Sequence, residues 1–284
     1  MRKDEVRIMY RLLYAGLSRL VKNRLLWILI AGMFALGLML SVITKPDGNI
    51  EMLYFIFSLP TGVLVGTVAC MFIGTDYSDG TIRNKLVVGH SRAAVYLSNF
   101  MLAIIGGFVV AAAYLLPILT IGIARLGGFV TPVKQVLIIT GIALLMTVAL
   151  GSLATLVIML TQSKAVAVVS FLVGLMALFT YSLWLHSALN QPEYIDNIIL
   201  TYDEADDGSS MSTEYQENIP NPNYVSGTKR EVYQFLLEFM PTGQMILITS
   251  QALVNLWQPA VYSLIIILVS TIAGVLVFRR QNIK

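Results

Sequence analysis

Residues 74–92 read GTDYSDGTIRNKLVVGHSR and form a short, charged stretch between two long apolar ones. The titratable side chains in this stretch are Asp76, Asp79, Arg83, Lys85, His90 and Arg92. Residues 52–73 before it and residues 93–124 after it contain no charged side chain. Both apolar runs exceed the roughly 18 to 20 residues that cross a bilayer. Residues 74–92 are therefore expected to be a loop outside the membrane, serving as either a plain turn or a docking surface.

The composition of the whole chain indicates a membrane protein. Of the 284 residues, 57% are hydrophobic and 12% are charged, and the mean hydropathy is +0.76, far above that of ordinary soluble domains. We expect an all-α polytopic fold with six transmembrane helices. The single cysteine, Cys70, lies inside an apolar run and is expected to act as a small apolar residue.

The apolar runs divide the chain into four regions. Residues 1–24 predict an amphipathic, basic helix that lies in the membrane interface as an elbow, although a merely basic tail is the alternative. Residues 25–186 predict the first five spans, followed by an extracellular region at 187–258, then the sixth span and a tail at 259–284. The spans are expected at 25–43, 52–73, 96–124, 133–160, 165–186 and 259–278, with a turn at 45–48.

The extracellular region has two parts. Residues 191–228 form an acidic insert, most acidic in the run DEADDGSS at 203–210, which predicts a solvated, unstructured loop. Its negative field could instead attract cationic peptides. Residues 231–257 predict two short helices broken at Pro241 and Gly243, as an interfacial or re-entrant hairpin before the last span.

Cations predict the orientation of the chain. With both termini in the cytoplasm, 14 of the 19 Lys and Arg residues lie on the cytoplasmic side, as the positive-inside rule requires. The expected location is a bacterial cell membrane, with multiple passes and with both termini cytoplasmic.

Several kinds of chemistry find no support in the sequence. No GxxxxGK[ST] phosphate loop or HExxH metal motif occurs, so neither nucleotide hydrolysis nor metal chemistry is expected in this chain. No charged residue lies near the centre of a span, which argues against ion-coupled transport. Gly62 and Gly66 have the GxxxG spacing that lets helices approach closely.

One motif in residues 74–92 resembles the ABC-2 family of ABC-transporter permeases. Such proteins carry an acidic residue, a GT-[IL]-R core and a later arginine in the loop between the second and third spans. The matching residues here are Asp76, the run 80–83 (GTIR) and Arg92. Many relatives have Glu where this chain has Asp76, and the acidic insert at 191–228 is unusual for the family. The elbow helix, six spans and broken hairpin also match in outline.

The resemblance implies that the loop contains a coupling helix, which seats in a groove of a separate cytoplasmic ATPase. It assigns coupling roles to Asp76, Tyr77, Asp79, Gly80, Thr81, Ile82, Arg83, Lys85 and Arg92. An Asp or Thr side chain at 79–81 is expected to cap this helix. Arg83 and Lys85 are expected to pair with acids of the ATPase, and Asp76 with a base there or in the elbow helix.

The expected function is ATP-driven export of a hydrophobic or amphipathic substrate, such as a peptide, a lantibiotic-like toxin, a drug or a lipid-like molecule. The resemblance implies an ABC ATPase subunit and a second, identical or different permease as partners within the lipid bilayer, and no nucleic acid. No cofactor is expected in this chain, whereas ATP and Mg²⁺ would bind the partner ATPase. The alternatives are a membrane sensor or scaffold with a ligand-binding outer loop, and an intramembrane enzyme, for which no paired polar groups are found.

Overall fold

The computed structural model describes the backbone of residues 3–45, 48–203 and 210–281, and the side chains of 9–45, 48–195 and 219–281. Within these residues, six helical stretches are long and apolar enough to cross a membrane: Arg24–Ile43, Ile50–Ser78, Arg92–Leu126, Val133–Thr161, Lys164–Leu189 and Trp257–Arg280. The predicted multi-pass helical architecture is therefore confirmed. Part of the predicted turn at 45–48 and most of the acidic run at 203–210 lie outside the described residues.

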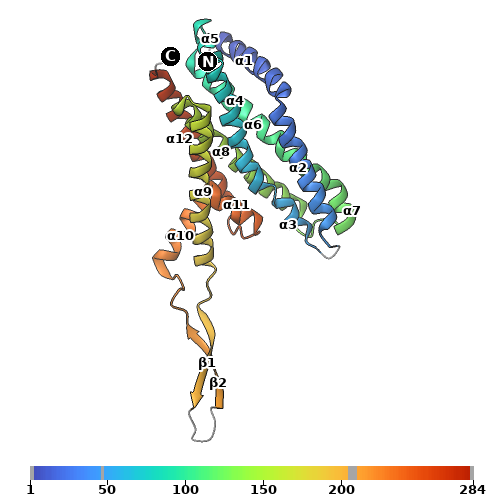
Figure 1. Cartoon of the computed structure of the whole chain (residues 1–284), viewed down its shortest axis with the longest axis vertical. Helices are drawn as coiled ribbons and strands as arrows, with labels where there is room; N and C mark the ends of the chain where they lie inside the picture. Colours follow the sequence, from blue (N-terminus) through green and yellow to red (C-terminus); the bar gives the residue numbers. More distant parts are fainter. Residues whose placement is uncertain (1–2, 46–47, 204–209, 282–284) are drawn as a thin grey trace.

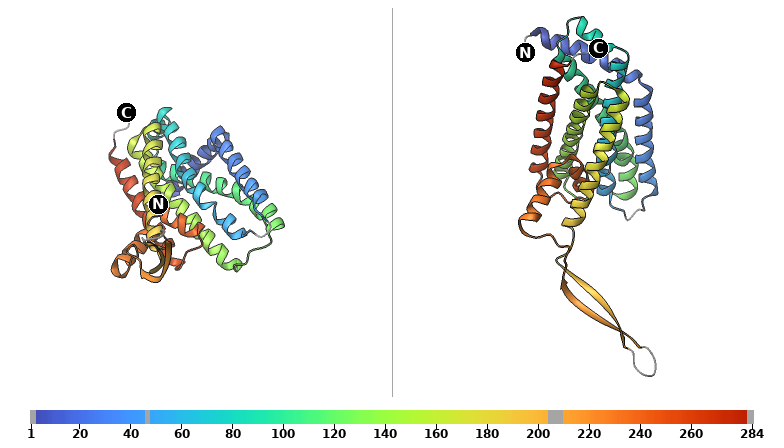
Figure 2. Two further views of the ribbon diagram at one scale, coloured as in Figure 1. Left: turned by 60° about the horizontal axis from the view of Figure 1, so that its bottom comes forward. Right: turned by 60° about the vertical axis from the view of Figure 1, so that its left-hand side comes forward.

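The helix α1 (Lys3–Lys22) lies across one end of the helix bundle, and α2 (Arg24–Ile43) runs along the length of the bundle (Figures 1 and 2). Both ends of the described chain, at Lys3 and Gln281, lie at this end, which we call the termini end. The two helices are separated by Asn23, whose side-chain oxygen accepts a 2.9 Å hydrogen bond from the Leu25 N–H. This bond satisfies one of the free N–H groups at the start of α2 and lets the chain change direction there.

The second span is two helices where the sequence predicted one over residues 52–73. These are α3 (Ile50–Phe55) and α4 (Ser58–Ser78). The α4 helix continues past the predicted boundary, so residues 74–78 are helical and only the rest of 74–92 leaves the span. The hydroxyl groups of Thr75 and Ser78 donate to the Met71 and Gly74 carbonyls at 2.9 and 3.1 Å. These bonds within the helix let polar residues extend it.

The third span changes its helical pattern at a proline. It consists of α6 (Arg92–Pro117), the π-helical turn η1 (Ile118–Gly122) and α7 (Ile123–Leu126). Pro117 has no N–H and therefore interrupts the regular bonding pattern of the helix. The fourth and fifth spans, α8 (Val133–Thr161) and α9 (Lys164–Leu189), match their predicted ranges within a few residues.

A β-hairpin in the predicted extracellular region corrects the all-α prediction. The strands β1 (Tyr194–Asp203) and β2 (Ser210–Pro220) pair antiparallel and project from the end opposite the termini end (Figure 1). The expectation of an unstructured loop at 191–228 is wrong for the paired residues. The run IILTY at 198–202 is rich in β-branched and aromatic residues, which favour strands.

Two helices occupy the region where the sequence predicted the broken hairpin, with boundaries that differ from the predicted ones. They are α10 (Gly227–Phe239) and α11 (Pro241–Thr249), and α12 (Trp257–Arg280) follows. The helices therefore begin before residue 231 and end before residue 257. Pro241 occupies the first turn of α11, where its missing N–H costs no hydrogen bond. Residues 241–248 are all buried, and α11 packs against α9, α8 and α4.

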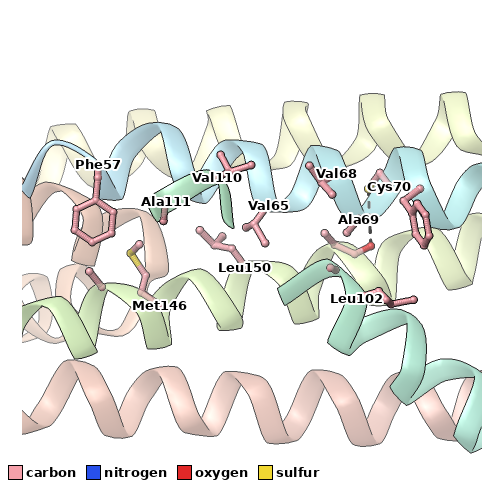
Figure 3. Packing of buried hydrophobic residues seen from close by; sticks show 14 of the residues in the cluster. Phe57, Val65, Val68, Ala69, Cys70, Leu102, Val110, Ala111, Met146 and Leu150 are labelled. Carbon is pink, nitrogen blue, oxygen red and sulfur yellow. Dashed lines mark hydrogen bonds between the residues drawn. The ribbon is translucent and has the colours of Figure 1, made fainter. Parts of the chain in front are cut away.

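The apolar core lies where α4, α6 and α8 meet, and Figure 3 shows part of it. Val65 on α4, Val110 on α6 and Met146 on α8 are all fully buried. The two glycines of α4 that the sequence predicted to allow close packing are both buried. A Cβ atom at Gly62 would overlap the Met245 side chain, and a Cβ atom at Gly66 would overlap the Phe171 ring. Glycine at these positions therefore lets α11 and α9 approach α4 closely.

Candidate functional site

The residues singled out by the sequence motif gather at the termini end of the bundle, around the short helix α5 (Thr81–Val87) (Figures 1 and 2). This helix lies between the ends of the second and third spans, and it contacts α4 and α6. Both neighbouring spans continue from it with only short connections. A displacement of α5 would therefore be transmitted to α4 and α6.

Asp76 is the electrostatic centre of the site. Its side chain is only 2% exposed, and its carboxylate lies 2.6 Å from the Arg19 guanidinium of α1 and 2.9 Å from the Lys85 ammonium of α5. A buried carboxylate is stable when nearby cations and hydrogen bonds replace its hydration. Arg19 also lies over the Phe72 ring, 5.3 Å from its centroid. Asp76 thus joins three helices that are separate in the sequence.

Asp76 forms its ion pairs with residues of this same chain. Asp76 was expected to pair with a base of the ATPase or of the elbow helix, and its partner Arg19 lies on α1. Lys85 was expected to pair with acids of the ATPase, whereas it donates a 2.9 Å hydrogen bond to Asp76. The spacing of Asp76 and Lys85 places this ammonium within reach, because α5 folds back beside the end of α4.

The start of α5 differs from the expected side-chain cap. Gly80 occupies the N-cap position with φ of +67°, and no side chain caps the helix. Asp79 instead ends α4 as its C-cap residue, and Thr81 is the first residue of α5. A left-handed backbone at residue 80 favours glycine, so Gly80 makes the sharp turn between the two helices.

The two faces of α5 differ in character. Ile82 is 1% exposed and packs into the main apolar core, whereas Arg83 is exposed. Val87 and Val88 are 78% and 77% exposed at the end of the helix. On the neighbouring helix α4, Tyr77 packs against the same core, and its hydroxyl donates to the Met159 Sδ atom at 3.2 Å. The site therefore combines an anchored inner face with an outer face that carries one cation and two apolar side chains.

Arg92 connects the site to the last span. Its Nη1 atom donates hydrogen bonds of 2.8 and 2.5 Å to the carbonyls of Phe278 and Gln281. Its guanidinium also lies 5.8 Å from the centroid of the Phe278 ring. A cation at the C-terminal end of a helix satisfies free carbonyls and complements the helix dipole. Arg92 therefore fixes the end of α12 to the start of α6.

The predicted turn residues Pro241 and Gly243 lie away from this site, in the first turn of α11. A Cβ atom at Gly243 would overlap the backbone carbonyl of Leu237, so the close contact between α10 and α11 requires glycine. Next to it, the Thr242 hydroxyl lies 2.8 Å from the Ser182 hydroxyl of α9. These contacts join the broken hairpin to the fifth span.

The sequence predicted a base of the elbow helix as one possible partner of Asp76 but did not identify Arg19 as that base. Arg19 was assigned only to the basic interfacial helix, because a pair separated by 57 positions leaves no local spacing signal. Lys164 was not assigned to the site either, and its ammonium donates to the Thr75 hydroxyl at 3.2 Å. Among the described residues, no group of three His, Cys, Asp or Glu side chains could hold a metal ion.

No protein-family model and no curated protein matches this chain.

Proposed function

We propose that this chain is a permease subunit of an ATP-driven ABC exporter, with α5 as the helix that receives force from a separate cytoplasmic ATPase. The observation that carries the proposal is the two-faced character of α5. Its inner face is fixed by Ile82 and by the Lys85–Asp76–Arg19 ion pairs, and its outer face presents Arg83, Val87 and Val88.

An anchored helix of this kind suits force transmission. Ion pairs and a buried apolar contact hold α5 against α4 and α1, and Arg92 holds the start of α6 against α12. A push on the outer face would therefore move several spans together, because packed interiors deform little. A flexible loop would absorb the same push.

The outer face also has the features of a protein contact. Exposed apolar side chains beside an arginine are typical of the central part of protein interfaces, where arginine is enriched. In this proposal Arg83 pairs with an acid of the ATPase, and Val87 and Val88 are buried against it. The ATPase binds ATP and Mg²⁺, and this chain contributes no nucleotide site.

The route of the substrate in the proposal lies between two permease subunits and is lined mainly by the second and fifth spans. An apolar cavity of about 270 Å³ lies between α4, α9 and α11, and its walls include Val63, Met176 and Met245. Such a surface suits a hydrophobic or amphipathic substrate, as proposed for a peptide, a lantibiotic-like toxin, a drug or a lipid-like molecule. Transport proceeds by alternating access.

The proposed orientation places the termini end in the cytoplasm of a bacterial cell. The excess of Lys and Arg in the segments at that end supports this orientation. The β1–β2 hairpin then projects outside the cell, and α1 lies in the cytoplasmic interface. The pair α10–α11 dips into the outer side of the membrane.

The decisive experiment is purification of the full chain in mild detergent from its native membranes, followed by identification of the proteins that copurify. We expect a stoichiometric P-loop ATPase that is lost with Arg83→Glu. The matched control is Lys134→Glu, because Lys134 is an exposed cation on α8 at the opposite end of the bundle. Retention of the ATPase by Arg83→Glu, or purification of the chain alone, would contradict the proposal.

The second candidate is a membrane sensor or scaffold that binds a ligand through its outer region. The projecting β1–β2 hairpin favours it, because paired strands give an extended surface outside the bundle (Figure 1). Deletion of residues 196–218 separates the two functions. If the chain is a sensor, this deletion removes ligand binding, and no ATPase copurifies with or without the hairpin. If the chain is an exporter subunit, the ATPase still copurifies after the deletion.

A further inference from the structure

A polar cavity of about 400 Å³ lies where α1, α4 and the start of α9 meet. Two cations from different helices line it, Arg19 of α1 and Lys164 of α9, and so do two carboxylates, Asp76 and Asp79. Its remaining wall includes the apolar side chains of Leu25, Met71 and Phe72. The cavity therefore presents two cations, two carboxylates and an apolar surface together, and one of the carboxylates, Asp76, is already paired with Arg19 and Lys85.

Both cations have hydrogen-bond donors left for a ligand. Arg19 uses two of the five N–H groups of a guanidinium on Asp76 and remains 40% exposed. Lys164 uses one of the three N–H groups of an ammonium on the Thr75 hydroxyl. No carboxylate lies within 4 Å of Lys164 in the part of the chain that the structure describes. A half-buried ammonium without a counterion favours an anionic ligand.

The cavity lies at the ends of three helical stretches that are long and apolar enough to cross a membrane: one begins at Arg24, one ends at Ser78 and one begins at Lys164. It opens beside the junction of α1 with the span α2, and α9 begins at Lys164 itself. The exposed indole of Trp27, one turn into α2, donates to the Val21 carbonyl of α1 at 2.7 Å. Tryptophan with one polar bond and an exposed ring is typical of the membrane–water interface.

We propose that this cavity binds one phospholipid with a primary amine in its headgroup, from the leaflet at the termini end. The phosphate lies between Lys164 and Arg19, and the amine lies at Asp79. The apolar side chains of Leu25, Met71 and Phe72 contact the glycerol and the first methylene groups. This apolar wall distinguishes a lipid from free phosphate, which has no apolar part to bury. The inference goes beyond the proposed transport function and does not rest on it.

The full chain, stripped of lipid in detergent and titrated with phosphatidylethanolamine, tests the site by native mass spectrometry. We expect one phosphatidylethanolamine to bind more tightly than the others, and Lys164→Gln to weaken this first binding about tenfold, because a hydrogen bond from a charged group to the phosphate is lost. Lys164→Arg should retain it. The matched control is Lys22→Gln, because Lys22 is an exposed cation of α1 that does not line the cavity.

Two further measurements identify the ligand. Asp79→Asn should remove the preference for phosphatidylethanolamine over phosphatidylcholine without weakening phosphatidylcholine binding. Inorganic phosphate at millimolar concentration should not displace the lipid. Unchanged binding in Lys164→Gln, or displacement by phosphate alone, would overturn the proposal. Circular dichroism and melting temperature establish that each variant is folded, and Lys164→Arg separates loss of charge from loss of packing.

Discussion

The Asp76 carboxylate on α4 lies 2.6 Å from the Arg19 guanidinium on α1, although 57 positions separate the two residues in the chain. The same carboxylate bonds Lys85 of α5 at 2.9 Å. The helix that lies across the bundle, the second span and the short surface helix are therefore held together at one buried charge. The carboxylate therefore gives a direct polar link from α5 to α1.

Asp76→Asn should destabilise the protein more than a change at any exposed acid of the same loop. The amide keeps the shape of the carboxylate but leaves Arg19 and Lys85 without their counterion. Removal of one partner from a buried ion pair costs about 3 to 5 kcal/mol, and we expect a loss of about 3 kcal/mol because Arg19 is 40% exposed. Thermal unfolding in detergent measures the change.

The control for this variant is Asp79→Asn. Asp79 is exposed, only three positions further along, and forms no ion pair with a described residue. Its replacement should leave the melting temperature in detergent nearly unchanged, as is usual for exposed polar residues. Equal losses in the two variants would show that Asp76 has no special structural role.

Gly66→Ala should destabilise the packing of α4 against α9. The added Cβ atom would overlap the Phe171 ring, which is 6% exposed and has little space into which to move. Overpacking of a close-packed interior costs about 1 to 3 kcal/mol. The matched control is Gly174→Ala on α9, where no atom lies within 4 Å of the added Cβ. Because alanine is the better helix former, this control should be neutral or stabilising, and a loss equal to that of Gly66→Ala would contradict the prediction.

The helical part of the fold could be predicted from the sequence because the bilayer fixes span length and polarity. Uncharged runs longer than a span, separated by short polar stretches, leave few alternatives. The position of α5 was also predictable, since polar residues near 79–92 cannot stay in an apolar span. The exact end of α4 was not, because Thr75 and Ser78 satisfy their hydroxyl groups on the helix itself.

The contacts of individual cations could not be predicted, because they depend on which helix ends meet. Arg92 was read as a coupling residue, and it also bonds carbonyls at the end of α12. Arg125 was given no role from the sequence, and its Nη1 donates to the Ser41 carbonyl of α2 at 2.6 Å. At both ends of the bundle an arginine satisfies the carbonyls that another helix leaves free.

The β-hairpin, in contrast, was missed although the sequence carried a local signal for it. Its strands were hidden by the acidic run at 203–210, which dominated the composition of the insert. The β-branched run before it was a local signal that composition averaged away. In this region, reading short windows would have given a better prediction than reading the whole insert.

Gln244→Leu should loosen the broken hairpin. The Gln244 amide nitrogen donates to the Glu238 carbonyl at 2.8 Å and to the Pro259 carbonyl at 3.2 Å, and its oxygen accepts from the Ser263 hydroxyl at 2.8 Å. This fully buried side chain thereby links α11 to α10 and α12. Leucine would leave buried polar groups unpaired, at a cost of about 1 to 3 kcal/mol each.

Hydrogen exchange resolves this effect by region. Amides of α11 should exchange faster in Gln244→Leu, whereas those of α1 should not change. Gln234→Leu on the exposed face of α10 is the control, and it should leave exchange in α11 as it is. Unchanged protection of α11 in Gln244→Leu would mean that apolar burial alone holds this helix.

Arg92→Lys tests whether the motif arginine acts within the chain. A lysine keeps the positive charge but cannot present a planar guanidinium to the Phe278 ring while bonding both carbonyls at the end of α12. We expect a loss of about 1 kcal/mol and faster hydrogen exchange in the last turn of α12, with a larger effect for Arg92→Gln. Arg83→Lys is the control, since Arg83 is exposed and forms no hydrogen bond or ion pair with the described residues. If Arg92 acted only on a partner protein, the purified chain alone would show the same exchange in α12 for Arg92→Gln as for the unmodified protein.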